Sequence, residues 1–272
     1  MRSKKPTCLA DPITWIVLLS LIWAVVLAFD LLPILRGGFG WEWNYKPVLE
    51  RFRILPIVAA TAVYVAAGLW LKKLRSAVPL VLWALAGSVG LSLAAVHVRG
   101  DELYRLYSIT VSGRAGGWHM AAARIQELTR TLRDWPQFML ASTAFSTHMG
   151  ISPPGMVLAY YAASSGLDRV PPLAASLAQP VRGLLCQYLS GYSSGDYASA
   201  WIGILMPVWG ALTVFPLYGL GRDAFGETVA RWSVLWWALV PSFLMFTPLP
   251  NVLYPLPAVI VIAMLWRALR RD

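Results

Sequence analysis

Charged residues are scarce in this sequence. Only 13% of its 272 residues are Asp, Glu, Lys or Arg, whereas about 25% is usual for a soluble domain. Hydrophobic residues make up 58% of the chain, and the mean hydropathy is +0.59. This balance excludes a soluble enzyme and a disordered tail, and it predicts a chain that lies in a lipid bilayer.

Cysteine is nearly absent as well. The two cysteines, Cys8 and Cys186, stand alone in the sequence, with no C-x-x-C pair and no Cys/His cluster. This spacing supports neither a zinc site nor the disulfide framework of a secreted scaffold, and we expect both thiols to be unpaired.

Acidic residues are outnumbered by basic ones, with 13 Asp and Glu against 23 Lys and Arg, which gives a formal net charge of +10. A nucleic-acid-binding protein often carries such an excess in one basic stripe. Here Lys and Arg instead form small groups beside apolar segments. We therefore attribute them to membrane topology and expect no nucleic-acid partner.

Six apolar segments approach the roughly 20 residues that a membrane-crossing helix needs. The sequence therefore predicts an all-α fold, a polytopic membrane helical bundle in one domain. The predicted spans lie near residues 13–32, 55–71, 77–98, 201–220, 232–247 and 252–267. The first segment has no small-residue cleavage site after it, which favours an uncleaved anchor over a signal peptide.

The apolar run 156–166 is a candidate for a seventh span, although it is shorter than a usual crossing. The positive-inside rule favours six spans over seven, because with six spans four basic clusters fall on the same side of the membrane. These clusters are Arg2/Lys4/Lys5, Lys72/Lys73/Arg75, Arg222/Arg231 and Arg267/Arg270/Arg271. We therefore expect both termini in the cytoplasm, although four basic residues in the first outer loop oppose this orientation.

This topology leaves a short outer loop, 36–53, and a large outer segment, 99–200. Within the outer segment we predict an interfacial helix over 156–166, entered through the rigid turn Pro153-Pro154-Gly155, and a second amphipathic piece around 173–189. Proline is frequent, and we interpret the prolines in or beside spans as helix kinks. They are Pro33, Pro56, Pro79, Pro207, Pro216, Pro241 and Pro257.

Acidic groups at membrane depth are costly and often functional, which singles out Asp30 at the outer end of the first span. The alternative is an interfacial acid exposed to water. Glu42 lies between Trp41 and Trp43 in a segment whose aromatic residues suit the headgroup layer. This acid either shapes a pocket at the membrane surface or simply belongs to an aromatic belt.

Two further candidates lie in the outer segment. Asp101 and Glu102 follow the third span directly and offer oxygen ligands to a divalent cation. Adjacent side chains diverge on a helix, so a solvated pair is the alternative. His148 precedes the Pro-Pro-Gly turn and is placed near the membrane surface, where a plain surface histidine is equally consistent with the sequence.

The order of these elements resembles the N-terminal part of an integral-membrane glycosyltransferase of the GT-C class. This superfamily includes the dolichyl-phosphate-mannose mannosyltransferases and the lipid A aminoarabinose transferases, and the likeness is to a largely uncharacterised bacterial branch. The motifs that carry it are Arg36-Gly37 with Trp41-Glu42-Trp43-Asn44-Tyr45, Leu132 to Pro136, Thr147 to Gly155, and the stretch from Ala211 to Phe243.

Two features depart from the family pattern. Ser152 stands where the family has a second histidine before Pro-Pro-Gly, which weakens a direct role for that position. The sequence also ends just after the sixth predicted span, whereas family members continue through several more helices. We therefore expect either a fragment or a shortened, inactive relative.

The resemblance implies transfer of a sugar from a polyprenyl-phosphate donor to an acceptor on the outer face of a bacterial plasma membrane. Such a reaction needs a carboxylate that takes the acceptor's proton and cations that hold the lipid phosphate. The resemblance implies that Asp30 is the base, with Glu42 as its substitute, and that Arg36, Arg105 and Arg133 contact the phosphate. It implies that the substrate is contacted by Trp41, Trp43, Tyr45 and His148. If a divalent metal is used, Asp101 or Glu102 would bind it.

Two other functions fit the same spans. A polytopic membrane protein without catalysis would bind a lipid or a partner through the outer segment and would not depend on Asp30. A transporter ranks last, because charged residues within the spans are nearly absent and no pair of matching broken helices is evident.

Overall fold

The computed structural model describes residues 12–37, 51–98, 100, 106–107, 110–111, 117–144, 153–185 and 193–270. Every regular element within these ranges is helical, and none of these residues lies in a strand. The predicted all-α class is therefore confirmed. The chain divides into two units, Met1–Arg51 and Phe52–Asp272, and each is described separately.

The first unit contains one long apolar helix, α1 (Pro12–Ala28), and the short 3₁₀ helix η2 (Pro33–Arg36). Between them Asp30 has a φ of 51°, a left-handed conformation that non-glycine residues rarely adopt. This residue turns the chain between the two helices. Large apolar side chains are exposed along α1, including Trp15, Ile16, Leu19 and Trp23.

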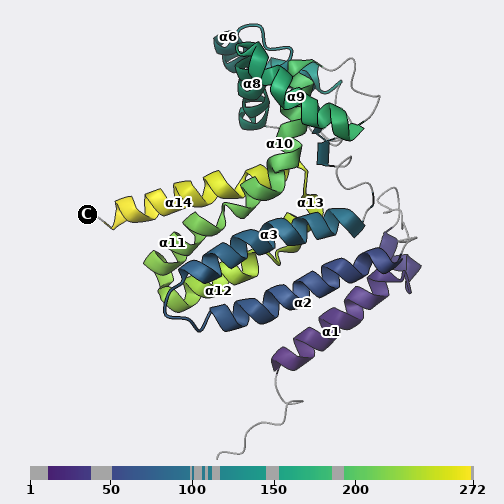
Figure 1. The fold of residues 1–272 in the computed structure, drawn as a ribbon, viewed down its shortest axis with the longest axis vertical. Helices are drawn as coiled ribbons and strands as arrows, with labels where there is room; N and C mark the ends of the chain where they lie inside the picture. The colour runs from purple at the N-terminus through teal and green to yellow at the C-terminus, as the bar shows by residue number, and fades with distance from the viewer. Residues whose placement is uncertain are drawn as a thin grey trace, which may run out of the picture. The chain divides into compact units, whose positions relative to one another are not determined.

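The second unit begins with a helical hairpin. Helix α2 (Ile54–Leu71) follows the short 3₁₀ helix η3 (Arg51–Arg53), and α3 (Val78–Val98) follows the turn that contains Lys72, Lys73 and Arg75. Farther along the chain come α10 (Ser194–Ala211), α11 (Val214–Phe225), α12 (Glu227–Trp237), α13 (Pro241–Phe246), η6 (Pro250–Leu253) and α14 (Pro255–Leu269). Helices α2, α3, α11 and α12 lie side by side (Figure 1).

Five stretches of the described chain are helical, long and apolar enough to cross a membrane: Ile54–Leu71, Val78–Val98, Ser194–Phe225, Glu227–Phe246 and Asn251–Leu269. They match five of the six predicted spans. The first predicted span corresponds to a shorter apolar helix, Thr14–Ala28, so the count of six is not confirmed. Helix α8 (Pro154–Asp168), which covers the run 156–166, is not among the five.

Many apolar side chains on these five stretches point outward. They include Val58, Trp70, Leu82, Ile262, Met264 and Leu265, each more than half exposed. A soluble monomer rarely exposes so much contiguous apolar surface. Contact with lipid tails accounts for it, because hydrocarbon solvates these side chains as well as a protein core does.

The core of this bundle joins α2, α3, α11 and α12 through buried residues such as Tyr64, Leu80 and Val234. The Tyr64 hydroxyl donates to the carbonyl of Leu235 over 2.8 Å. Gly68 faces Leu235 so closely that a β-carbon would collide with it. The missing side chain therefore lets α2 approach α12.

Arg231 fastens the turn of the first hairpin to α12. Its guanidinium donates to the carbonyls of Lys72 at 2.9 Å, Leu74 at 2.5 Å and Arg75 at 2.9 Å, and to the carboxylate of Glu227 at 2.5 Å. Only a planar fork with several donors can serve these acceptors at once. The carbonyls of the turn after α2 thus gain partners that no helix provides for them.

A second group of helices packs around the N-terminal end of α10: α5 (Trp118–Ala122), α6 (Leu128–Arg133), α7 (Trp135–Ser142), α8 and α9 (Pro171–Leu185). In Figure 1 they gather at the end of α10 away from α11. Helix α8 begins at Pro154 after an extended Pro153, as the Pro-Pro-Gly turn predicts. The amphipathic piece expected around 173–189 corresponds to α9 as far as Leu185, and its last four residues lie outside the described part of the chain.

Thr110 links the segment before α5 to α10. Its hydroxyl donates to the carbonyl of Ser199 at 2.9 Å, and the Ser199 hydroxyl donates back to the carbonyl of Thr110 at 2.7 Å. Next to this pair, a β-carbon on Gly203 would overlap the backbone oxygen of Leu106. A glycine at this position allows the two backbones to touch.

Candidate functional site

The predicted base, Asp30, forms an ion pair with a predicted phosphate partner, Arg36. The Arg36 Nε donates to Oδ1 of Asp30 at 2.8 Å, and its second nitrogen donates to Oδ2. The left-handed turn at Asp30 brings η2 back toward the end of α1 and so makes this pair possible. The Asp30 side chain is 13% exposed and the Arg36 side chain 36%, so the carboxylate is the more shielded partner.

Most other predicted site residues lie outside the described part of the chain. These are Trp41, Glu42, Trp43, Tyr45, Asp101, Glu102, Arg105 and His148. Arg133 is described: it ends α6, is exposed, and lines neither of the two pockets discussed below. Of the predicted set, the structure therefore brings together Asp30 and Arg36.

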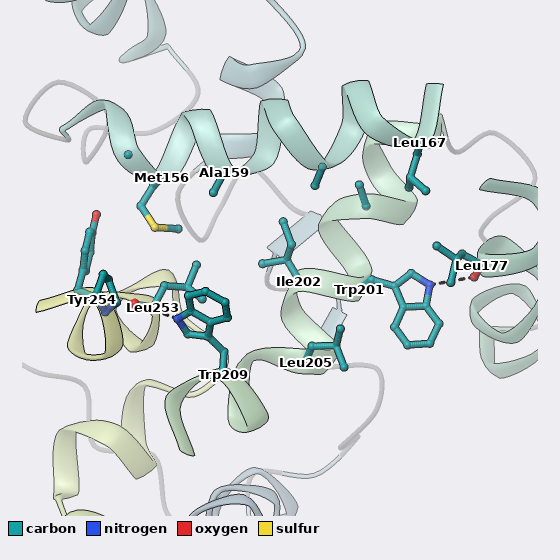
Figure 2. Close-up of a pocket in the computed structure, with 14 residues that line it drawn as sticks. Met156, Ala159, Leu167, Leu177, Trp201, Ile202, Leu205, Trp209, Leu253 and Tyr254 are labelled. Carbon is teal, nitrogen blue, oxygen red and sulfur yellow. Dashed lines mark hydrogen bonds between the residues drawn. The ribbon is translucent and has the colours of Figure 1, made fainter. Parts of the chain in front are cut away.

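An apolar pocket of about 560 Å³ lies between α8, α10 and the segment that leads into α14. This volume is within the range of roughly 300 to 1,000 Å³ found for small-molecule sites. Figure 2 shows Met156 and Ala159 on α8 facing Ile202 and Trp209 on α10, with Leu253 and Tyr254 at one end.

The two tryptophans of this pocket have their polar atoms occupied. The indole N–H of Trp201 donates to the carbonyl of Leu177 at 2.9 Å, and that of Trp209 donates to the carbonyl of Leu253 at 3.0 Å. Their ring carbons are left to face the pocket (Figure 2). The pocket therefore suits hydrocarbon rather than a polar ligand.

A second pocket, of about 250 Å³, adjoins a different stripe of α8. Tyr160, Ser164 and Asp168 recur every four residues along the helix and share one face. They meet the N-terminal end of α10 and His119 of α5; the complete lining is His119, Ala123, Tyr160, Ser164, Asp168, Ser193, Ser194, Gly195 and Asp196. We call it the polar pocket.

The carboxylate of Asp196 has a different partner on each oxygen. Oδ2 accepts hydrogen bonds from the backbone N–H and the hydroxyl of Ser193, at 2.8 and 3.0 Å, within a capping box that starts α10. Oδ1 lies 3.6 Å from Nε2 of His119. Capping thus holds the carboxylate in place beside the imidazole.

His119 is largely buried, with 10% of its side chain exposed. Burial lowers its pKa below the ordinary value of 6.5, while the negative charge of Asp196 and the nearby carbonyl of Thr110 oppose the shift. Burial also raises the pKa of the Tyr160 hydroxyl. At neutral pH the imidazole of His119 and the phenol of Tyr160 are therefore both neutral.

The sequence did not predict His119 or Asp196 as site residues. Their nearness depends on how α5 packs against α8 and α10, and a single chain gives no sign of that. The capping pattern Ser193-x-x-Asp196 and the isolated Trp118-His119 after a glycine pair were the available signals. No group of three or more His, Cys, Asp or Glu that could hold a metal occurs among the residues described.

Neither protein-family models nor curated proteins nor solved structures yielded a match to the chain.

Proposed function

We propose that this chain is a membrane glycosyltransferase-like protein. It takes a sugar from a polyprenyl-phosphate donor and passes it to an acceptor at the outer face of a bacterial plasma membrane. The observation that carries the proposal is the apolar pocket between α8 and α10. The likeness of Arg36-Gly37, residues 41–45 and residues 147–155 to the GT-C class supports the same activity.

A polyprenyl donor is hydrocarbon over almost its entire length, and each buried CH₂ stabilises binding by about 0.8 kcal/mol. The apolar pocket offers aliphatic and aromatic carbon, and the indole N–H groups of Trp201 and Trp209 are already bonded. Part of the isoprenoid chain would lie against these residues. The phosphate and sugar would remain outside this lining.

In the transfer step the acceptor oxygen bonds to the anomeric carbon, and the bond from that carbon to the phosphate oxygen breaks. The proton of the acceptor hydroxyl passes to a carboxylate, for which Asp30 is the candidate and Glu42 the substitute. Polyprenyl phosphate leaves with the bonding electrons. Arg36, together with Arg105 and Arg133, is the candidate set for stabilising its charge.

Replacing Asp30 with Asn tests the base. We expect the rate of polyprenyl phosphate release from a polyprenyl-phosphate sugar, measured with the chain in lipid nanodiscs, to fall by about 10²- to 10⁴-fold. Glu127→Gln, which changes an exposed acid directly before α6, serves as the matched control and keeps the normal rate. An unchanged rate in the Asp30 variant would exclude Asp30 as the base.

The lipid site is tested separately by filling the apolar pocket. Ala163 lines it, whereas the neighbouring Ala162 lines neither pocket and is exposed. Ala163→Phe should raise the KM for the lipid donor, and Ala162→Phe should not. If both variants bind the donor as the unmodified chain does, the apolar pocket is not the lipid site.

The second candidate function is a non-catalytic protein that binds a lipid. One observation favours it: the Arg36 fork engages both oxygens of Asp30, which leaves fewer lone pairs to receive a proton. This function would be supported if the chain binds the lipid donor, Ala163→Phe weakens that binding, and no polyprenyl phosphate is released.

A further inference from the structure

We propose that the polar pocket binds a neutral polyhydroxylated ligand, of the size of one sugar ring, between α8 and the N-terminal end of α10. The proposal stands apart from the transfer reaction, because it uses neither Asp30 nor the apolar pocket. It assigns a binding role to His119, Asp168 and Asp196.

The lining matches the hydrogen-bonding needs of hydroxyl groups. Each hydroxyl both donates and accepts, so a polyol needs acceptors and donors around it. Asp168 and Oδ1 of Asp196 supply charged acceptors, and Tyr160 and Ser194 supply groups that do both. His119, with its lowered pKa, adds one donor and one acceptor.

Buried polar atoms in the pocket still lack good partners. The Tyr160 hydroxyl belongs to a residue that is 2% exposed and makes no hydrogen bond of normal geometry, although Ser199 lies near it. Nδ1 of His119 is likewise buried without such a bond, although the carbonyl of Thr110 lies near the ring. Buried side-chain polar atoms are usually satisfied, so each of these two atoms would gain a partner if its side chain turned slightly toward a ligand hydroxyl.

The charges of the pocket argue against an anionic ligand. Among the described residues that line it, none is Lys or Arg, so two carboxylates would repel a phosphate. The volume of about 250 Å³ is below the range for drug-sized molecules. A single neutral ring with several hydroxyls fits both the charge and the volume.

Saturation-transfer NMR with the chain in nanodiscs of neutral lipid tests the proposal. The probes are free neutral hexoses and pentoses, with inorganic phosphate and an alkylammonium ion as comparators, and no lipid donor is present. We expect at least one neutral sugar to bind. Asp168→Asn should weaken that binding about tenfold, since a hydrogen bond to a charged group is lost.

Two more variants strengthen the test. Ser164→Ala removes one hydroxyl from the same stripe of α8 and should weaken binding by several fold, while Asp134→Asn should leave it unchanged. Both Asp168 and Ser164 retain solvent exposure, so their replacement spares the core.

The proposal is overturned if no neutral sugar binds, if phosphate or alkylammonium binds in its place, or if Asp168→Asn and Ser164→Ala bind sugar as tightly as the unmodified chain. These outcomes are separate from those of the release assay. A chain that binds free sugar but never releases polyprenyl phosphate would refute the transfer reaction and leave this site in place.

Discussion

His119 combines a buried imidazole with a carboxylate, and at the scale of single residues it predicts how stability responds to pH. Because its pKa is lowered in the folded chain, the unfolded chain takes up the proton first as the pH falls. Stability should therefore be full above the ordinary value of 6.5 and decline as the pH falls through it. Asp196, Asp168 and Tyr160 are the other titratable groups that line this pocket.

The measurement is the thermal unfolding midpoint in detergent micelles, followed from pH 8 to pH 5. Each kcal/mol of lost stability should lower the midpoint by about 2 to 4 °C. The variant His119→Gln cannot titrate, so its midpoint should fall less over the same range. If the midpoints of the two proteins depended equally on pH, groups other than His119 would control the pH dependence of stability.

Single residues also show where the sequence was informative. The place of Asp30 at the end of an apolar segment singles it out as a candidate, whereas Arg36 is a candidate through the resemblance to the GT-C class. Their mutual ion pair depends on the left-handed backbone at Asp30, φ 51°, and a non-glycine residue gives no warning of that. His119 and Asp196 were missed because packing alone joins them.

At the scale of helices, apolar length predicted the spans well but not their ends. Helix α10 begins at Ser194 rather than near residue 201, since the Ser193–Asp196 capping box adds a polar first turn. The apolar pattern also runs unbroken past Leu212 and Thr213, where α10 ends and α11 begins. Hydropathy cannot register a turn made of residues that are themselves apolar or small.

The prolines show a related limit. The sequence predicts kinks at these prolines, and Pro207 does lie inside α10. Pro79 and Pro241 instead lie in the first turns of α3 and α13, where the missing N–H has no helical partner to lose. The same residue type thus marks the start of a helix more readily than its bend.

The contact between α10 and the segment before α5 predicts the effect of two glycine replacements. Gly203→Ala would push against the backbone of Leu106 and the side chain of Thr110, so we expect a loss of about 1 to 3 kcal/mol in unfolding free energy. Gly90 of α3 has open space around its α-carbon. Gly90→Ala should be neutral or stabilising by up to about 1 kcal/mol.

Reversible unfolding of both variants in mixed micelles would measure the difference. If Gly203→Ala proved as stable as Gly90→Ala, the close approach of the two backbones would not be needed. Faster amide hydrogen exchange at Thr110 in the Gly203→Ala variant, with exchange elsewhere unchanged, would show that the loss of stability arises at this contact.

For the whole molecule, the number of crossings determines where the two ends lie. Five crossings, as found among the helices of sufficient length, place the termini on opposite sides of the membrane. A sixth crossing by α1 returns both termini to the same side, which the basic clusters predict to be the cytoplasm.

Reporter fusions at each end decide between these two topologies. We expect a cytoplasmic reporter to be active at both the N-terminus and the C-terminus, and an outer-face reporter to be active when inserted near residue 150. If the N-terminal and C-terminal reporters show that the two termini lie on opposite sides of the membrane, α1 does not cross it.

Helix α8 presents two neighbouring linings, with Met156, Ala159 and Ala163 toward the apolar pocket and Tyr160, Ser164 and Asp168 toward the polar one. Successive residues of a helix are about 100° apart, so the two linings differ by a single step of register. One inserted residue early in α8 would turn the rest of the helix by that step and exchange hydroxyls for hydrocarbon. Substitutions in α8 can therefore change either lining during evolution, whereas an insertion or deletion in the first turn of α8 would disrupt both linings.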